Sequence, residues 1–161
     1  MRLEKFLENA DGCRTRFRDR NGKRIHIGDL LHFFCRDGEK TVELSVTEFY
    51  GLYLDQNTDV LQHLNADGTP AEDCLILRRV PRRSESLDEY LENVTGCETP
   101  FRDGNYESIC VGSRLFWESV RGDYFEAVMR YSADFGLYLD GAPLHLDNLD
   151  KKDCLEWTLL H

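Results

Sequence analysis

Cysteine and histidine are the residues of this chain with the most distinctive chemistry, and they recur in two matching sets. The sets are Cys13, His63 and Cys74, and Cys97, His145 and Cys154. Three such side chains can contribute to a metal site, or a cysteine beside a histidine and an acid can act as a nucleophile. The sets are therefore the first candidates for a functional site in each half of the chain.

The spacing of these residues supports neither use. Structural zinc sites take about four ligands, commonly from close pairs such as C-x2-C, and no such pair occurs here. The chain also lacks G-x-S-x-G, a P-loop, G-x-G-x-x-G and H-E-x-x-H. We interpret His63 and His145 as structural histidines and most of the cysteines as small buried hydrophobes. The sequence predicts a protein without catalytic residues, metal or cofactor.

The compartment follows from the same cysteines and from the absence of an export signal. Six cysteines are an even number, which in a secreted chain suggests disulfides. The N-terminus, MRLEKFLENADG, has no long apolar segment, and no stretch reaches the roughly 18–20 apolar residues that cross a bilayer. We therefore predict a cytoplasmic protein that keeps its cysteines as thiols and does not enter a membrane.

A tandem duplication is the strongest pattern in the sequence. Residues 8–19 read ENADGCRTRFRD, and residues 92–103 read ENVTGCETPFRD. GLYLD occurs at 51–55 and again at 136–140, and a late DCL pairs Cys74 with Cys154. Two copies of about 80 residues favour paired globular domains over a solenoid, which needs three or more shorter units.

The repeats set the predicted domain boundaries. The first repeat is expected at 1–80 and the second at 87–161. Pro81 interrupts the pattern between them, so residues 81–86 are interpreted as the linker.

Within each repeat the pattern predicts one short helix followed by several strands. Leu3, Phe6 and Leu7 lie at i, i+3 and i+4, which is typical of an apolar helical face. Later, Val42, Leu44 and Val46 alternate with polar residues, as expected of a half-buried strand. The predicted fold is mainly β (α+β), with a short N-terminal helix and a small SH3-like antiparallel β-barrel in each repeat. A single sheet shared by both repeats is the main alternative.

The stretch FRDRNGKRIHIGDLLHF at 17–33 resembles the core motif of YopX-like phage proteins. The matching positions in the first repeat are Asp19, Asn21, Gly22, Lys23, Ile25, Gly28 and Asp29, and those in the second are Asp103, Asn105, Ile109 and Gly112. Asn-Gly and Gly-Asp are turn formers, so the motif describes a strand held between two turns. The resemblance covers about a tenth of the chain. It implies a small β-rich protein of a phage or mobile element, without catalytic residues to transfer.

Charge is distributed unevenly between the repeats. Residues 1–83 contain 14 Lys and Arg and 14 Asp and Glu, whereas residues 84–161 contain 6 and 16. The whole net charge of −10 therefore belongs to the second repeat. A solvated surface is one interpretation of these acids. The other is a contact surface for a basic protein, with candidate residues Asp123, Glu126, Asp134, Asp140, Asp147, Asp150 and Asp153.

The first repeat and the linker carry a basic set that favours other ligands. It comprises Arg14, Arg16, Arg18, Arg20, Lys23, Arg24, Arg78, Arg79, Arg82 and Arg83. Such a set suits phosphates or nucleic acid, but the strong negative charge of the whole chain opposes general binding to DNA. The second hypothesis is capture of a nucleotide in a barrel mouth or in the cleft between the two copies, ringed by Arg16, Arg18 and Arg78. Direct binding of nucleic acid is the third.

Protein binding is the leading hypothesis. Tyr53 and Tyr138 are expected to project away from the core between inward-facing leucines, where tyrosine can anchor an interface. The sequence predicts a non-enzymatic accessory protein of a phage or mobile element. It binds a basic surface of a host protein through its acidic second domain, as an anti-defence or anti-CRISPR-like inhibitor would. Self-association between the basic and acidic faces is a further prediction.

Overall fold

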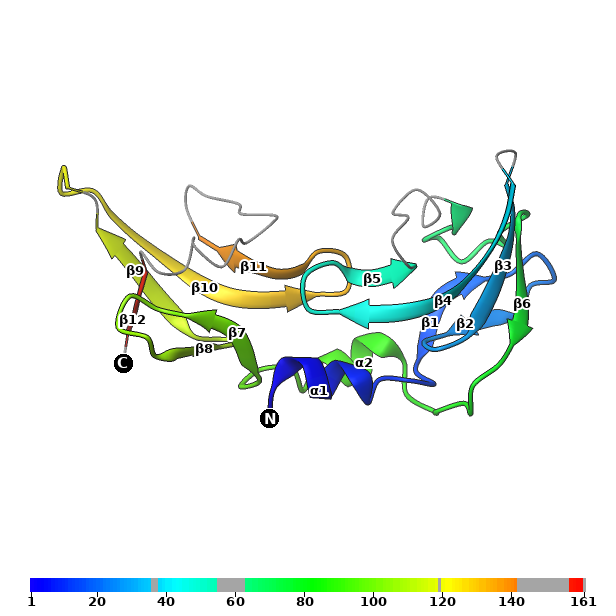
Figure 1. Ribbon diagram of the computed structural model, residues 1–161, viewed down its shortest axis with the longest axis horizontal. Coiled ribbons are helices and arrows are strands. Elements are labelled where there is room, and N and C mark those ends of the chain that lie inside the picture. Colours follow the sequence, from blue (N-terminus) through cyan, green and yellow to red (C-terminus); the bar gives the residue numbers. More distant parts are fainter. Residues whose placement is uncertain (36–37, 55–62, 119, 142–156, 161) are drawn as a thin grey trace. The chain divides into compact units, whose positions relative to one another are not determined.

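The computed structural model describes residues 1–35, 38–54, 63–118, 120–141 and 157–160, and the order of elements repeats along the chain (Figure 1). The first half contains α1 (Leu3–Glu8), β1 (Arg14–Arg18), β2 (Arg24–His26), β3 (Leu30–Cys35), β4 (Gly38–Thr47), β5 (Gly51–Leu54) and β6 (Cys74–Arg78). The second half contains α2 (Leu87–Leu91), β7 (Glu98–Arg102), β8 (Ser108–Cys110), β9 (Arg114–Glu118), β10 (Tyr124–Ser132), β11 (Gly136–Asp140) and β12 (Thr158–Leu159). Each half thus has one helix and six strands among the described residues.

The helices form where the apolar spacing predicts them. Leu3, Phe6 and Leu7 are all buried, which confirms the apolar face of α1. At the start of α2 the Ser86 hydroxyl oxygen accepts a hydrogen bond of 3.1 Å from the Glu89 N–H. This contact satisfies one of the N–H groups that a helix leaves unpaired at its beginning. Neither of the described helices has the length and apolar character needed to span a bilayer.

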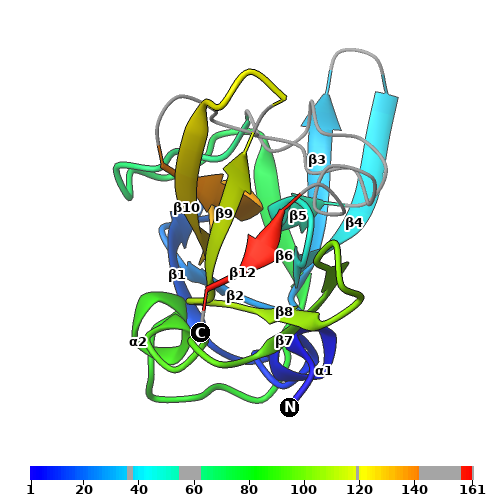
Figure 2. The same ribbon diagram turned by 90° about the vertical axis from the view of Figure 1, so that its left-hand side faces the viewer.

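The strands form small sheets rather than the predicted SH3-like barrel. One four-stranded sheet has the order β5-β4-β3-β6, and the other has the order β11-β10-β9-β12, in which β9 lies between β10 and β12 (Figure 2). β1 with β2, and β7 with β8, form two-stranded antiparallel ribbons. No sheet closes on itself among the residues described. The prediction of a mainly β protein is confirmed, and that of a closed barrel is not.

The long strands bury alternate residues. In β4, Val42, Leu44 and Val46 are buried while the residues between them are exposed or half-buried. In β10, Ala127 and Met129 occupy the buried positions. Because side chains of a strand point alternately to opposite faces, each strand covers a core with one face only.

The chain forms two compact units, and each unit contains parts of both repeats. Unit 1 consists of Met1–Leu7, Thr47–Gly51 and Glu92–His161, and unit 2 consists of Glu8–Val46 and Leu52–Leu91. The helix that opens each repeat is therefore grouped with strands of the other repeat. A boundary within the linker 81–86 does not separate the two units.

Backbone contacts show this exchange of N-terminal segments in both units. In unit 1 the Glu98 N–H donates to the Met1 carbonyl at 3.0 Å, and Arg2 forms a parallel bridge with Glu98. In unit 2 the Arg14 N–H donates to the Glu85 carbonyl at 3.1 Å, and Ser86 forms the same bridge with Arg14. The two sets of contacts correspond residue for residue after a shift of 84 positions. The exchange is therefore reciprocal.

Unit 1 also brings together the tips of two hairpins. The Leu137 N–H donates to the Glu48 carbonyl at 2.7 Å, and the Tyr131 hydroxyl donates to the Thr47 carbonyl at 2.7 Å. Gly51 and Gly136 are the first residues of β5 and β11, directly after the turns, and have φ of 71° and 76°, a conformation that favours glycine.

Candidate functional site

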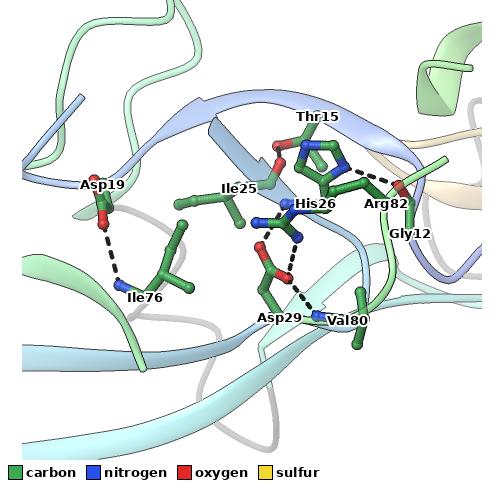
Figure 3. Close-up of polar contacts among 9 residues, drawn as sticks. All are labelled: Gly12, Thr15, Asp19, Ile25, His26, Asp29, Ile76, Val80 and Arg82. Carbon is green, nitrogen blue, oxygen red and sulfur yellow. Dashed lines mark hydrogen bonds and ion pairs between the residues drawn. The ribbon is translucent and has the colours of Figure 1, made fainter. Parts of the chain in front are cut away.

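The buried carboxylate of Asp29 lies at the centre of a polar network in unit 2 (Figure 3). One oxygen, Oδ2, accepts the His26 N–H at 2.9 Å. The other, Oδ1, accepts the Val80 N–H at 3.2 Å and the Arg82 guanidinium at 2.5 Å. The carboxylate thereby holds the turn after β2 and the segment after β6. Because both oxygens accept hydrogen bonds from groups of the protein itself, we interpret this acid as a structural group.

The ring of His26 does not form an acid–base pair with Asp29, since only its backbone contacts the carboxylate. Its Nδ1 lies 2.8 Å from the Gly12 carbonyl oxygen. A carbonyl only accepts, so Nδ1 carries the proton. Burial lowers the pKa of His26, and the charge of Arg82 also lowers it, against the hydrogen bond to Gly12. The ring is therefore neutral at pH 7 and ties the loop before β1 to β2.

Two further buried aspartates repeat one structural device. In unit 2, Asp19 Oδ1 accepts the N–H groups of Asn21 and Lys23, both at 3.0 Å, while Oδ2 accepts the Ile76 N–H at 3.2 Å. The first two contacts close the turn after β1, and the third holds β6. Asp19, Asn21 and Lys23 all belong to the stretch 17–33, so in this stretch the aspartate holds a turn.

The same device recurs in unit 1 around Asp103, which is fully buried. Its Oδ1 accepts the N–H groups of Asn105 at 2.9 Å and Glu107 at 2.8 Å, and its Oδ2 accepts the Leu159 N–H at 3.0 Å. The matching position of Asp29 is Ser113, whose hydroxyl accepts the Cys110 N–H at 3.0 Å. The second repeat thus keeps the turn without the buried charge.

The hydrogen bonds correct the sequence match between Cys74 and Cys154. The Cys74 carbonyl accepts the Arg20 N–H at 2.8 Å, and the Trp157 carbonyl accepts the equivalent Gly104 N–H at 2.7 Å. Structurally, Cys74 therefore corresponds to Trp157. The sequence match relied on the identical residues DCL. The pairing of β12 with β9 instead places the equivalent of β6 three residues further along the chain. Cys154 and His145 lie outside the described residues.

The described cysteines and histidines do not form a functional cluster. Cys13, Cys74 and Cys97 are buried free thiols, and Cys110 is a half-buried one. His63 lies 3.5 Å from Asp73. Over the part of the chain that the structure describes, no group of three or more potential metal ligands comes together.

The buried and half-buried thiols are expected to differ in their rate of alkylation in the folded protein. Burial raises the pKa of Cys74 to about 12, and burial also raises the pKa of Cys13. The thiolate is the reactive form, so at pH 8 iodoacetamide should label Cys110 at least about tenfold faster than Cys74. Peptide mass spectrometry at timed intervals measures the two rates, and a urea-unfolded sample should label them alike. Equal rates in the folded protein would contradict the assigned burial.

Most of the predicted basic surface is occupied by contacts within unit 2. Arg18 donates to the Gly22 carbonyl, Arg24 to the Thr15 carbonyl and Arg14 to the Ser84 carbonyl. The remaining pairs are Arg14 with Glu89, Arg16 with Asp88, Arg82 with Asp29 and Arg83 with Glu85, and the guanidinium of Arg20 lies over the ring of Phe34. These arginines hold backbone and carboxylates of the protein itself.

Within the described part of the chain, the side chains of three residues of the basic set are exposed and make no such contact: Lys23, Arg78 and Arg79. Of the ring predicted for a nucleotide, Arg16 pairs with Asp88 and Arg18 with a carbonyl. The geometry therefore gives neither the nucleotide hypothesis nor the nucleic-acid hypothesis a formed site in the described residues.

The predicted acidic surface lies in unit 1, and two of its described members, Glu126 and Asp140, lie beside arginines. Glu126 lies 3.4 Å from Arg114, and Asp140 lies 2.7 Å from Arg130. Both are exposed pairs, which contribute little to stability and can exchange partners. Asp134 is exposed at the turn before β11, and Asp123 is exposed before β10. Asp147, Asp150 and Asp153 lie outside the described residues.

The exposed aromatic residues differ from the predicted ones. Tyr53 and Tyr138 are half-buried, whereas Tyr50 and Phe135 retain 54% and 55% of their surface and Phe49 retains 37%. These three side chains belong to the hairpin tips that meet in unit 1. The signal in the sequence is the aromatic residue that precedes each GLYLD, in EFYG and ADFG. We call Phe49, Tyr50 and Phe135 the aromatic tips.

Comparison with known protein families, with characterised proteins and with solved structures found no match for this chain.

Proposed function

We propose that the protein acts by binding a basic surface of another protein through the acidic face of unit 1, and that it catalyses no reaction. The observation that carries the proposal is the charge of that unit. Unit 1 contains 8 Lys and Arg against 15 Asp and Glu, whereas unit 2 contains 12 against 15. Most of the net charge of −10 therefore belongs to one compact unit, which favours encounter with a basic partner.

The aromatic tips support the same proposal. Exposed tyrosine and phenylalanine beside acidic residues supply the apolar contact area that charge alone does not give. Phe135 follows Asp134 directly, and both are exposed. A host protein of the bacterium that carries a phage or mobile element is the proposed partner, in line with the resemblance of residues 17–33 to YopX-like proteins. Inhibition of that partner, as in anti-defence proteins, is part of the proposal.

Charge-neutralised variants of the intact protein test this function. In the first variant, Asp134→Asn, Glu126→Gln and Asp140→Asn remove three charges from unit 1. Arg114 and Arg130 then lose their carboxylates, so this face should repel a basic partner. In pull-downs from bacterial lysate with stepped salt, the amount of partner retained should fall about tenfold or more.

A second variant controls for the change in net charge. Asp67→Asn, Glu72→Gln and Asp73→Asn remove the same three charges from unit 2, where all three residues are exposed. It should retain the partner as the unmodified protein does. An equal loss in both variants, or no partner with any protein, would overturn the proposal.

A further inference from the structure

Unit 1 contains a cavity of about 230 Å³ whose lining is rich in charge. Three carboxylates, from Glu4, Glu48 and Glu98, line it together with Thr99 and Pro100. Arg2 and Arg102 also border it. The lining brings together the N-terminal segment, a hairpin tip and β7, three parts of the chain that only the folded unit assembles.

The lining holds three carboxylates against the two guanidinium groups of Arg2 and Arg102, so negative charge is in excess in this cavity. Burial raises the pKa of Glu48, and the negative charge of Glu4 raises it further, against a hydrogen bond from the Glu4 backbone. Glu98 accepts a hydrogen bond of 3.0 Å from the Ser108 hydroxyl, which is neutral. The Arg102 guanidinium donates to the Tyr106 carbonyl at 3.0 Å. An added cation would therefore gain from Glu4 and Glu48.

The equivalent place in unit 2 shows which cation fits. A shift of 84 positions relates Glu4 to Asp88 and Pro100 to Arg16. In unit 2 the Arg16 guanidinium lies 3.6 Å from the Asp88 carboxylate. The protein thus places a guanidinium of its own beside the carboxylate on the exchanged helix segment.

Unit 1 has the carboxylate of Glu4, but proline stands at the position equivalent to Arg16. β1 and β7 share the same pattern of burial at their first four positions, and both Arg16 and Pro100 are at the exposed third position. Their side chains therefore leave corresponding strands on the same face. Proline is short and uncharged, so this position supplies no cation beside Glu4 in unit 1, whereas Arg16 supplies one beside Asp88 in unit 2.

We propose that the cavity lined by Glu4, Glu48 and Pro100 binds the guanidinium group of an arginine side chain on the partner. This inference rests on the proposed function and names one contact by which unit 1 would bind its partner. Arginine is preferred over lysine because its planar group can donate two parallel hydrogen bonds to one carboxylate and can contact two carboxylates at once.

The probe for this site is N-acetyl-arginine methylamide, titrated into the isotope-labelled intact protein while amide NMR shifts are followed. Saturable shifts are expected at Glu48 and at Glu98–Arg102, and salt should weaken them. N-acetyl-norleucine methylamide, which lacks the guanidinium, should give no saturable shift at these residues. Shifts confined to other residues, or equal shifts with both probes, would overturn the proposal.

Three variants sharpen the titration. Pro100→Arg supplies the guanidinium internally, at a strand position where the first repeat already carries arginine, and should weaken probe binding at least about tenfold. Glu48→Gln, which keeps the shape of the side chain, should weaken it about three- to tenfold. Arg16→Ala removes a guanidinium in unit 2 and should leave binding at the cavity unchanged. Unaltered binding by both Pro100→Arg and Glu48→Gln would contradict the site.

The same variants separate this inference from the proposed function. If the lysate partner is retained by Pro100→Arg as well as by the unmodified protein, the cavity is not the contact, and binding through the acidic face stands. If the probe binds at the cavity but no partner is retained by any protein, the site stands and the proposed function fails.

Discussion

Replacing Asp19 by alanine is expected to lower the free energy of unfolding by about 3 kcal/mol or more. Its side chain is only 1% exposed and accepts three backbone N–H groups, from Asn21, Lys23 and Ile76. A buried donor that loses its partner costs about 1–3 kcal/mol, and water can replace only part of this loss at a half-buried turn. Urea unfolding followed by circular dichroism measures the change.

Two further substitutions test this explanation. Asp103→Ala should have a similar effect, because Asp103 accepts the corresponding three N–H groups in unit 1. Asp67 also accepts a backbone N–H, from Thr69, but its side chain is exposed, so Asp67→Ala should cost less than about 1 kcal/mol. If Asp19→Ala and Asp67→Ala proved equally mild, the buried carboxylates would not be the groups that hold the turns.

Gly136→Ala is the second substitution with a large expected effect, again about 3 kcal/mol or more. A Cβ at Gly136 would lie 2.5 Å from the Phe49 carbonyl carbon, and one at Gly51 would lie 2.1 Å from the Ala133 carbonyl oxygen. Backbone atoms cannot yield as the end of a flexible side chain can, so the hairpin tips in unit 1 must separate. Thermal or urea unfolding measures the loss.

Gly22→Ala is the matched control. Gly22 has φ of 75°, close to the 76° of Gly136, but a Cβ there would meet nothing within 4 Å. This variant therefore reports the strain of the backbone alone, about 1–2 kcal/mol. The excess of Gly136→Ala over Gly22→Ala measures the tip contact. No excess would mean that the tips do not pack as described.

Local structure could be predicted from the sequence because it depends on neighbouring residues. The spacing of Leu3, Phe6 and Leu7 indicated a helical face, and the alternation of Val42 and Leu44 indicated a half-buried strand; both are confirmed. The exchange of N-terminal segments could not be predicted. The apolar face of a helix shows that the helix must pack against other residues, but not which ones. Both repeats contain equivalent β strands against which it could pack.

The candidate site was less predictable than the fold. Arginine-rich sequence such as RTRFRDRNGKR indicates positive charge, but it does not show that Arg18 and Arg24 will donate to carbonyls of the same unit. The cavity of unit 1 was also missed, because Glu4, Glu48 and Glu98 are far apart in the sequence. The nearest signal was the replacement of Arg16 by Pro100 within otherwise matching segments.

The reciprocal exchange of N-terminal segments has a consequence for how the two units can diverge. In a homodimer with this exchange, a single codon would specify both copies of every position. A substitution that opened a cavity in one subunit would therefore open the same cavity in the other. Here positions 16 and 100 are encoded separately, although each unit still depends on a segment from the other repeat. Unit 2 can therefore keep the ion pair of Arg16 with Asp88, while unit 1 replaces the equivalent arginine with Pro100.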